Sequence, residues 1–394
     1  MLFAKGKGMW SRIRIFLILT AAAVMMAGCA AGEGGLSFTD GLAYDETDHA
    51  WTTEEEAFRK LVRIMRQECA APDTASGVYL LATDDRIVFL QGVNSVETDG
   101  KTPVNAYTVF EIGSVTKTFT ATAVLQLWEQ GKLNLDDPLR KYFPEYEKGA
   151  EITIRQLLHM ESGLRREFFP DDVLENDPNL MKKYYTDGFS DDELLAALFE
   201  AEPGFPSGTK YEYSNVNYTL LAMIMEKITG ESYGDYIREH IFSACGMEHS
   251  YCMEPGGLTS VPEPIPEGTY SFDFDDMFPT GYMSDFRTTR GAGDICSCAA
   301  DLLAFHRALT GGKLLSRESL DEMFNTESGY GCGWVSVGRR EPAYLHSGGT
   351  PSYMAHNLYC RTEKYGSLYL IILNPTVRNP SHVESIMRDL LMNY

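Results

Sequence analysis

The sequence predicts an α+β fold in which strands from both ends of the chain form one antiparallel β-sheet, flanked by helices, with a mostly helical lobe between them. Near the N-terminus, apolar runs at 77–82 and 86–91 are split by two aspartates, a pattern typical of a β-hairpin. Near the C-terminus, further apolar runs at 344–347, 353–360 and 367–373 predict three strands. This arrangement leaves a cleft between the sheet and the helical lobe.

Apolar residues between these strands recur at helical spacing. The first expected helix begins near Thr52 or Thr53, because the glutamates that follow suit the positive end of a helix. Its apolar face comprises Phe58, Leu61, Val62, Met65 and Cys69. The other expected helices span 114–130, 152–160, 191–199, 218–228, 233–242, 300–309 and 381–392. The rest of 165–208 and all of 253–290 show no such period, so we expect loops there that shape the pocket.

The first 28 residues have the pattern of an export signal. Four basic residues precede an apolar run at 15–26, which is too short for a comfortable membrane span. The run ends in Met26-Ala27-Gly28-Cys29, which resembles the lipobox of bacterial lipoproteins, in which the cysteine carries a diacylglyceryl group. The alternative is a plain secretory signal or an uncleaved anchor, with Cys29 incidental.

These features divide the chain into a signal peptide (1–28), a flexible tether (29–50) and one folded domain (51–394), with the helical lobe inserted at about 132–290. The resemblance to lipoproteins implies that Cys29 anchors the protein to the cell membrane, with the folded domain outside the cytoplasm. The sequence leaves the oligomeric state open.

Charge and cysteine content exclude several function classes. Removal of 1–28 takes away four basic residues and no acidic ones, so the net charge falls from −22 to −26 and nucleic acid is a poor partner. The chain has eight cysteines but no Cys-x-x-Cys pair and no histidine-rich tract, so we expect no metal site and no cofactor.

Ser114 and Lys117 are the strongest candidates for catalysis. They lie three residues apart at the start of an expected helix, so the lysine amine can reach the serine hydroxyl. A serine hydroxyl is a weak nucleophile until a base takes its proton, and a buried lysine with a lowered pKa can be that base. A second Ser-x-x-Lys, Ser207 to Lys210, lies among glycine and proline residues and is interpreted as a turn.

Two further motifs complete the candidate site. Tyr213-Ser214-Asn215 precedes a helix; a tyrosine beside a lysine ammonium has a lowered pKa and can move protons, and Asn215 can orient Lys117 and the substrate. His346-Ser347-Gly348-Gly349 ends a strand, where glycines let a substrate backbone lie close. The alternatives are core packing for Tyr213 and a plain buried histidine at position 346. Lys364-Tyr365-Gly366 lies in a turn and is discounted.

In this order the three motifs resemble those of the class C β-lactamase-like and penicillin-binding-protein-like serine hydrolases. The flanking stretches that fit as well are Phe110-Glu111-Ile112-Gly113, 157–164 and Gly348-Gly349-Thr350-Pro351. The resemblance covers the chain from about Gly77 onward.

The resemblance implies that Ser114 is acylated, that Lys117 and Tyr213 share the base and acid roles, and that Asn215 binds Lys117 and the substrate. It also implies an oxyanion hole formed by the N–H groups of Ser114 and Gly349. His346 stands where class C β-lactamases usually have lysine, so β-lactam hydrolysis is in doubt.

We therefore expect a serine hydrolase that acts on an ester or a D-amino-acid amide, on a small-molecule or peptidoglycan-derived substrate at the cell envelope. The alternatives are a D-Ala-D-Ala carboxypeptidase or β-lactamase, and a binding or sensing lipoprotein without turnover. We also expect His346 to become a cation toward pH 5.5 and then to favour substrates that carry a carboxylate.

Overall fold

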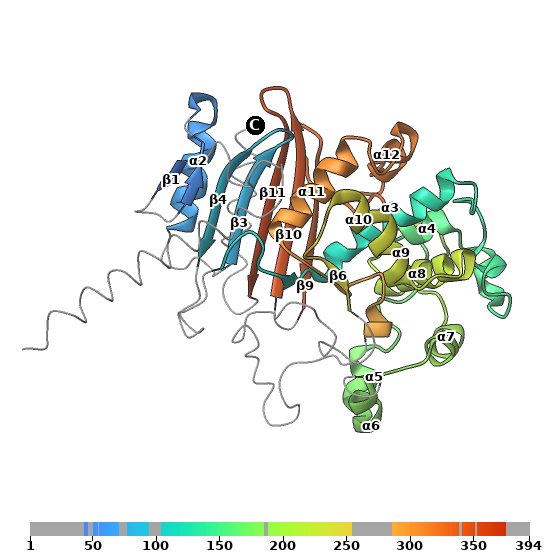
Figure 1. Ribbon diagram of the computed structural model, residues 1–394. Coiled ribbons are helices and arrows are strands. Elements are labelled where there is room, and N and C mark those ends of the chain that lie inside the picture. The colour runs from blue at the N-terminus through green and yellow to red at the C-terminus, as the bar shows by residue number, and fades with distance from the viewer. Residues whose placement is uncertain are drawn as a thin grey trace, which may run out of the picture.

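The computed structural model describes residues 43–45, 50–53, 55–70, 77–93, 104–184, 188–253, 286–338, 341–350 and 353–375. Within these ranges the largest element is an antiparallel sheet in the order β1-β2-β4-β3-β11-β10-β9-β8 (Figure 1). Its strands are β1 (Ala43–Asp45), β2 (Ala50–Thr52), β3 (Gly77–Thr83), β4 (Ile87–Val93), β8 (Val335–Ser336), β9 (Ala343–Gly349), β10 (Tyr353–Thr362) and β11 (Gly366–Pro375).

The two ends of the chain meet in the middle of this sheet, where β3 pairs with β11. Val78 lies opposite Leu373, and Leu80 lies opposite Ile371. Every residue of β3 is buried, so both faces of the sheet are covered at its centre. The predicted hairpin and the three C-terminal strands are therefore present, and the sheet is built from both chain ends as expected.

One face of the sheet is covered by α2 (Arg59–Cys69) and the other by α11 (Ala299–Thr310) (Figure 1). Leu61 and Met65 of α2 pack in one apolar cluster with Leu81 of β3. On the opposite face, Val78 and Leu80 belong to the larger core. Each fully buried Leu or Ile side chain contributes about 1.5–3 kcal/mol, so alternate residues of β3 hold the two layers together.

The helical lobe lies to one side of the sheet and is centred on α3 (Thr116–Glu129) and α8 (Asn215–Thr229) (Figure 1). Its other helical elements are η2 (Gly113–Val115), η3 (Leu139–Lys141), η4 (Glu147–Ala150), α4 (Ile154–Leu158), α5 (Asp171–Asn176), α6 (Pro178–Lys182), α7 (Asp191–Phe199), α9 (Tyr233–Ile237), the π-helical turn Arg238–Phe242, α10 (Ser243–Cys245), η8 (Phe286–Thr289) and α12 (Arg317–Met323). Phe119 of α3 stacks on Phe305 of α11 with ring centroids 4.0 Å apart, which joins the lobe to the layer over the sheet.

A second, three-stranded sheet connects the lobe to the segment that precedes Ser114. Its order is β5 (Phe110–Glu111), β7 (Ile295–Ser297) and β6 (Tyr251–Cys252). The Ile112 N–H donates to the Ile295 carbonyl (3.0 Å), and the Ile295 N–H donates to Thr116 Oγ1 (3.1 Å). This short sheet therefore fixes where α3 begins.

Several expectations need correction. The flexible tether predicted to residue 50 is too long, because 43–45 pair with 50–52 as β1 and β2. The first helix starts at Arg59, after a 3₁₀ turn at Glu56–Phe58, because residues 50–52 are in a strand. The segment predicted to be irregular contains α5 and α6. Helix α12 and the three-stranded sheet were not predicted from the sequence.

Some predictions fall on residues that the structure does not describe: the signal peptide with Cys29, most of the loop 253–290, and the helix 381–392. Among the residues that it does describe, no helix combines the length and the apolar character that a membrane crossing needs.

Candidate active site

Ser114 lies in the 3₁₀ turn that leads into α3. Gly113 before it has φ +48°, in the left-handed region, and a Cβ at this residue would lie 2.9 Å from both the nitrogen and the oxygen of Gly349. Only glycine fits there without displacing the strand. Ser114 itself is half-buried.

The Lys117 side chain is fully buried one helical turn after Ser114. Its Nζ lies 3.1 Å from Ser114 Oγ, 2.7 Å from Asn215 Oδ1 and 2.7 Å from the Ala292 carbonyl oxygen. Burial lowers the pKa of Lys117 to about 7, while the nearby Glu167 carboxylate opposes this shift. The lysine is thus poised between its two protonation states near neutral pH.

These three contacts suit a neutral amine that acts as a base. A neutral lysine has two N–H donors and one lone pair. The Asn215 and Ala292 oxygens can only accept, so they take the two N–H groups. The lone pair then faces the Ser114 hydroxyl, which can donate its proton. The prediction that burial lowers the Lys117 pKa agrees with this geometry.

Tyr213 and Asn215 are positioned by the start of α8. Ser214 is the N-cap residue, and its hydroxyl accepts from the Asn217 N–H and donates to the Arg165 carbonyl (2.7 Å). Asn215 is therefore the first residue of the helix. Its Oδ1 faces Lys117, and its Nδ2 donates to Glu167 Oε1 (2.6 Å). Both ends of the amide are used, which fixes its orientation.

The expectation of a lowered Tyr213 pKa is wrong. Burial raises the pKa of Tyr213, although a hydrogen bond with the Ser114 side chain and the positive charge of Arg166 partly offset the rise. Lys117 Nζ lies 4.9 Å from the Tyr213 ring centroid, but a lysine whose own pKa is about 7 is a weak source of positive charge. Tyr213 stays protonated at neutral pH, so it is suited to donate a proton.

The end of β9 passes directly over Ser114. A Cβ on Gly348 would lie 1.9 Å from the Ile112 carbonyl oxygen and 2.7 Å from the Ser114 nitrogen. Gly348 is buried and Gly349 is exposed, so the strand leaves the core between these two residues, next to Ser114. The motif at 346–349 thus meets Ser114 as expected, through its glycine backbone.

His346 does not fit the substrate-binding role that we expected for its ring. It is buried, and its Nδ1 lies 2.8 Å from the Ser347 carbonyl oxygen. Since a carbonyl only accepts, Nδ1 carries the proton and Nε2 accepts from the Tyr330 hydroxyl (3.1 Å). Burial and, to a smaller extent, the charge of Lys117 lower the pKa of His346 to about 3. The alternative of a buried, neutral histidine describes this residue, and it does not become a cation near pH 5.5.

Ser347 also points away from the nucleophile. Its hydroxyl pairs with His356 Nδ1 at 2.8 Å, on the sheet face toward α2.

The second Ser-x-x-Lys motif, Ser207 to Lys210, does not form a pair, because its two side chains have other partners. Ser207 Oγ donates to Gln156 Oε1 (2.7 Å), whereas Lys210 Nζ pairs with Glu212 Oε2 (2.9 Å) on the surface. The interpretation of Ser207 as a turn residue agrees with these contacts.

Three groups at the site were missed by the sequence analysis. They are the Glu167 carboxylate beside Asn215, the Ala292 carbonyl beside Lys117, and Tyr330, whose hydroxyl holds His346. The first two come from irregular segments, where no periodicity marks a residue. Tyr330 belongs to Tyr330-Gly331-Cys332-Gly333-Trp334, a run of glycines and large side chains that could have been recognised as a close backbone approach.

A Ser-x-x-Lys pair at a helix start with its lysine buried, a Tyr-x-Asn at a second helix and a Gly-Gly strand end over the serine together define the serine hydrolases that form an acyl-enzyme. A sequence model of the β-lactamase family matches residues 61–376, so the chain belongs to the β-lactamase family and is a serine hydrolase.

Individual relatives agree with this assignment. The Bacillus subtilis (strain 168) protein PbpX is 30% identical over 307 residues, which cover 77% of this chain and 71% of the relative. Penicillin-binding protein 4* of the same strain is 27% identical over 327 residues, 75% of this chain and 67% of the relative. The crystal structure of a D-stereospecific amidohydrolase from Streptomyces sp. superposes with a TM-score of 0.67 at 26% identity, covering 84% of this chain and 99% of that chain.

Proposed function

We propose that this chain hydrolyses an ester or a D-amino-acid amide through an acyl intermediate on Ser114. The observation that carries the proposal is the 3.1 Å contact between Lys117 Nζ and Ser114 Oγ, made by a lysine whose pKa is lowered to about 7. A base near neutrality, already in contact with the nucleophile, is what acyl transfer to serine requires.

In the proposed reaction Lys117 takes the Ser114 proton while Oγ forms a bond to the substrate carbonyl carbon. The carbonyl oxygen becomes an oxyanion, which the N–H groups of Ser114 and Gly349 stabilise. Tyr213 donates a proton to the leaving group as the carbon–leaving-group bond breaks, and it recovers that proton from Lys117. Water then attacks the ester on Ser114, and the same groups carry its proton in the reverse sense.

Two features of the site favour a substrate that has an amine rather than a carboxylate near the scissile bond. The ring of His346 is neutral and both its nitrogens are used inside the protein. The Glu167 carboxylate stands on the other side of Asn215 from Lys117, where it also pairs with Arg166 (Nε–Oε1 3.5 Å). Arg166 is largely exposed, so this pair leaves part of the negative charge to attract an ammonium group. Together with the neutral His346, this favours an amino-acid amide or a neutral ester over a β-lactam or a D-Ala-D-Ala peptide.

We also propose that the protein acts outside the cytoplasm, tethered through a lipid on Cys29. The support is the order of basic segment, apolar run and small residues before Cys29. Cys29→Ser should release the protein from membranes or leave an unprocessed precursor. Equal membrane retention and equal mass of the two forms would contradict lipidation.

The substrate class is tested with matched pairs of D- and L-amino-acid amides, a short-chain chromogenic ester, a penicillin and a D-Ala-D-Ala peptide. We expect turnover of the ester or the D-amide, and weak turnover of the penicillin and the peptide. Ser114→Ala serves as the inactive control. Turnover of none of these compounds, with clear binding in the site, would instead favour the non-catalytic lipoprotein.

A further inference from the structure

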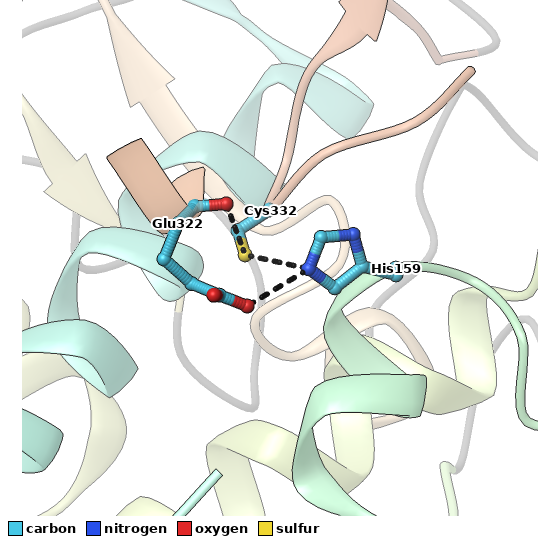
Figure 2. A group of neighbouring side chains, drawn as sticks. All are labelled: His159, Glu322 and Cys332. Atoms are coloured by element: carbon cyan, nitrogen blue, oxygen red, sulfur yellow. Dashed lines mark hydrogen bonds and ion pairs between the residues drawn. The ribbon is translucent and has the colours of Figure 1, made fainter. Parts of the chain in front are cut away.

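Three side chains from distant parts of the chain meet beside the active site (Figure 2). His159 follows α4, Glu322 lies in α12, and Cys332 precedes β8. His159 Nε2 lies 3.2 Å from Glu322 Oε1 and 3.5 Å from Cys332 Sγ, and the three ligand atoms all lie within 4.8 Å of one another. His159 and Cys332 are buried, and Cys332 is a free thiol.

The arrangement differs from a proton relay. In a relay the nucleophile and the acid contact opposite nitrogens of the imidazole. Here the thiol and the carboxylate both lie at Nε2, while Nδ1 lies 3.1 Å from the Tyr330 carbonyl oxygen. Because a carbonyl only accepts, Nδ1 carries a proton. Nε2 faces the Glu322 carboxylate, which also only accepts, so in the metal-free protein Nε2 carries a proton as well. A metal ion would replace that proton, and nitrogen, sulfur and carboxylate oxygen would then face it as three electron-pair donors.

Two of the three distances between ligand atoms match a tetrahedral zinc site. With Zn–N of about 2.0–2.1 Å, Zn–O of about 2.0–2.2 Å and Zn–S of about 2.3 Å, tetrahedral angles place nitrogen and sulfur roughly 3.6 Å apart and nitrogen and oxygen roughly 3.4 Å apart. The structure has 3.5 Å and 3.2 Å for these two pairs. A thiolate and a carboxylate together carry two negative charges, which a divalent ion balances.

Neighbouring groups also match a metal site. Ligating histidines usually donate their other N–H to a carbonyl or a carboxylate, as His159 does to Tyr330. Arg155 pairs with Glu322 and also with Asp136 (Nε–Oδ1 3.1 Å). The guanidinium orients the carboxylate, and it keeps Asp136 as a partner when a metal ion takes Glu322.

We propose that His159, Glu322 and Cys332 bind a divalent zinc-like metal ion, with water as the fourth ligand. The ion would brace Tyr330, whose carbonyl holds His159 and whose hydroxyl holds His346 at the active site. No metal was expected from the sequence, because the chain has no Cys-x-x-Cys pair and no histidine-rich tract. Ligands contributed by residues 159, 322 and 332 have no local spacing that could reveal them.

A second group of similar composition provides a matched control. His249, Cys298 and Asp301 also lie near one another, but Asp301 Oδ2 accepts from the backbone N–H of His249 and from the Ser250 hydroxyl, each at 2.8 Å. Glu322 has side-chain partners, and Arg155 keeps Asp136 when it releases Glu322, whereas Asp301 is held by a backbone N–H. His249 Nδ1 is also 3.9 Å from Asp301 Oδ1. Cys298 is as fully buried as Cys332, so Cys298→Ser tests whether loss of any buried thiol has the same effect.

The test uses the full chain, purified in detergent, stripped with a chelator and titrated with Zn²⁺ or Co²⁺. We expect about one ion per chain, a sulfur-to-cobalt charge-transfer band with Co²⁺, and a Tm that rises with Zn²⁺. Cys332→Ser should remove the band and weaken Zn²⁺ binding by more than the roughly 10–100-fold that loss of an outer-shell partner costs. Glu322→Gln, at a partly exposed position, should weaken Zn²⁺ binding with the fold intact, and Cys298→Ser should bind as wild type. Absence of a bound ion in the wild type, or equal binding by wild type and Cys332→Ser, would overturn the proposal.

Discussion

Gly348 runs so close to Ile112 that a Cβ on Gly348 would lie 1.9 Å from the Ile112 carbonyl oxygen. The contact joins the end of β9 to the segment that leads into Ser114, so it fixes the position of the strand relative to the nucleophile. The requirement for glycine comes from this approach of two backbones. It does not come from a turn, since Gly348 has an ordinary φ.

Gly348→Ala should therefore separate β9 from Ser114. We expect a loss of stability of about 1–3 kcal/mol, the usual cost of overpacking, and a larger loss of kcat/KM than of stability. Thermal unfolding and ester hydrolysis measure the two effects. Gly204→Ala is the control, because its Cβ would meet only the Gly163 oxygen at 3.8 Å. Wild-type activity in Gly348→Ala would show that this contact does not position the site.

The pKa of Lys117 predicts the pH dependence of acylation. The lysine acts as a base only when neutral, and its pKa is lowered to about 7. Below that pH it is protonated, so kcat/KM should fall about tenfold per unit as the pH drops, and it should level off above pH 8. The raised pKa of Tyr213 keeps the proton donor intact on the alkaline side. A profile that is flat from pH 5 to 8 would contradict Lys117 as the base.

His346 should not act as a pH sensor. Its pKa is lowered to about 3, so the ring stays neutral between pH 7 and 5.5. The ratio of kcat/KM for two substrates that differ only by a carboxylate should therefore remain constant across this range. A ratio that rises toward pH 5.5 in the wild type but not in His346→Gln would contradict this, and it would show that His346 becomes charged and binds the substrate carboxylate.

Glu167 should select substrates with an amine. Glu167→Gln keeps the shape and an oxygen acceptor for Asn215 Nδ2 but removes the negative charge. We expect kcat/KM for an amino-acid amide to fall about tenfold, the scale of a hydrogen bond to a charged group, with little change for a neutral ester. Equal losses for both substrates would mean that Glu167 acts only by holding Asn215 and Arg166. Glu161→Gln is a control for the loss of another carboxylate in the same chain segment.

The parts of the fold that could be predicted are those with a strong local pattern. The hairpin at 77–93 and strands β9 to β11 are apolar runs bounded by turn residues, and α8 has a serine cap and a terminal glycine. Helices α5 and α6 are only six and five residues long and bury little, so they leave no periodicity. Strands β5 to β7 exist because of pairing between distant segments, which local patterns do not report.

At the site too, features with a local sequence pattern could be predicted, and contacts between distant segments could not be read from local patterns. Ser114 and Lys117 could be predicted because they share one helical turn. The contact between Lys117 and Asn215 spans 98 residues, and it was expected from the chemistry of an amide beside a lysine and from the resemblance to a family. Burial of His346 and Tyr213 was named as an alternative, but neither source could decide it. Burial keeps His346 neutral and raises the pKa of Tyr213, and at these two residues the expected pKa was wrong.

The most direct test is the capture of the acyl-enzyme on Ser114 in wild type, Lys117→Ala and Lys210→Ala, followed by intact-protein mass spectrometry during single-turnover reaction with an activated ester. Wild type and Lys210→Ala should acylate at the same rate, with the mass increase on the peptide that contains Ser114. Lys117→Ala should acylate about 10²–10⁴-fold more slowly with its fold unchanged by circular dichroism. Acylation at another residue, or equal rates for wild type and Lys117→Ala, would contradict a mechanism in which Lys117 activates Ser114.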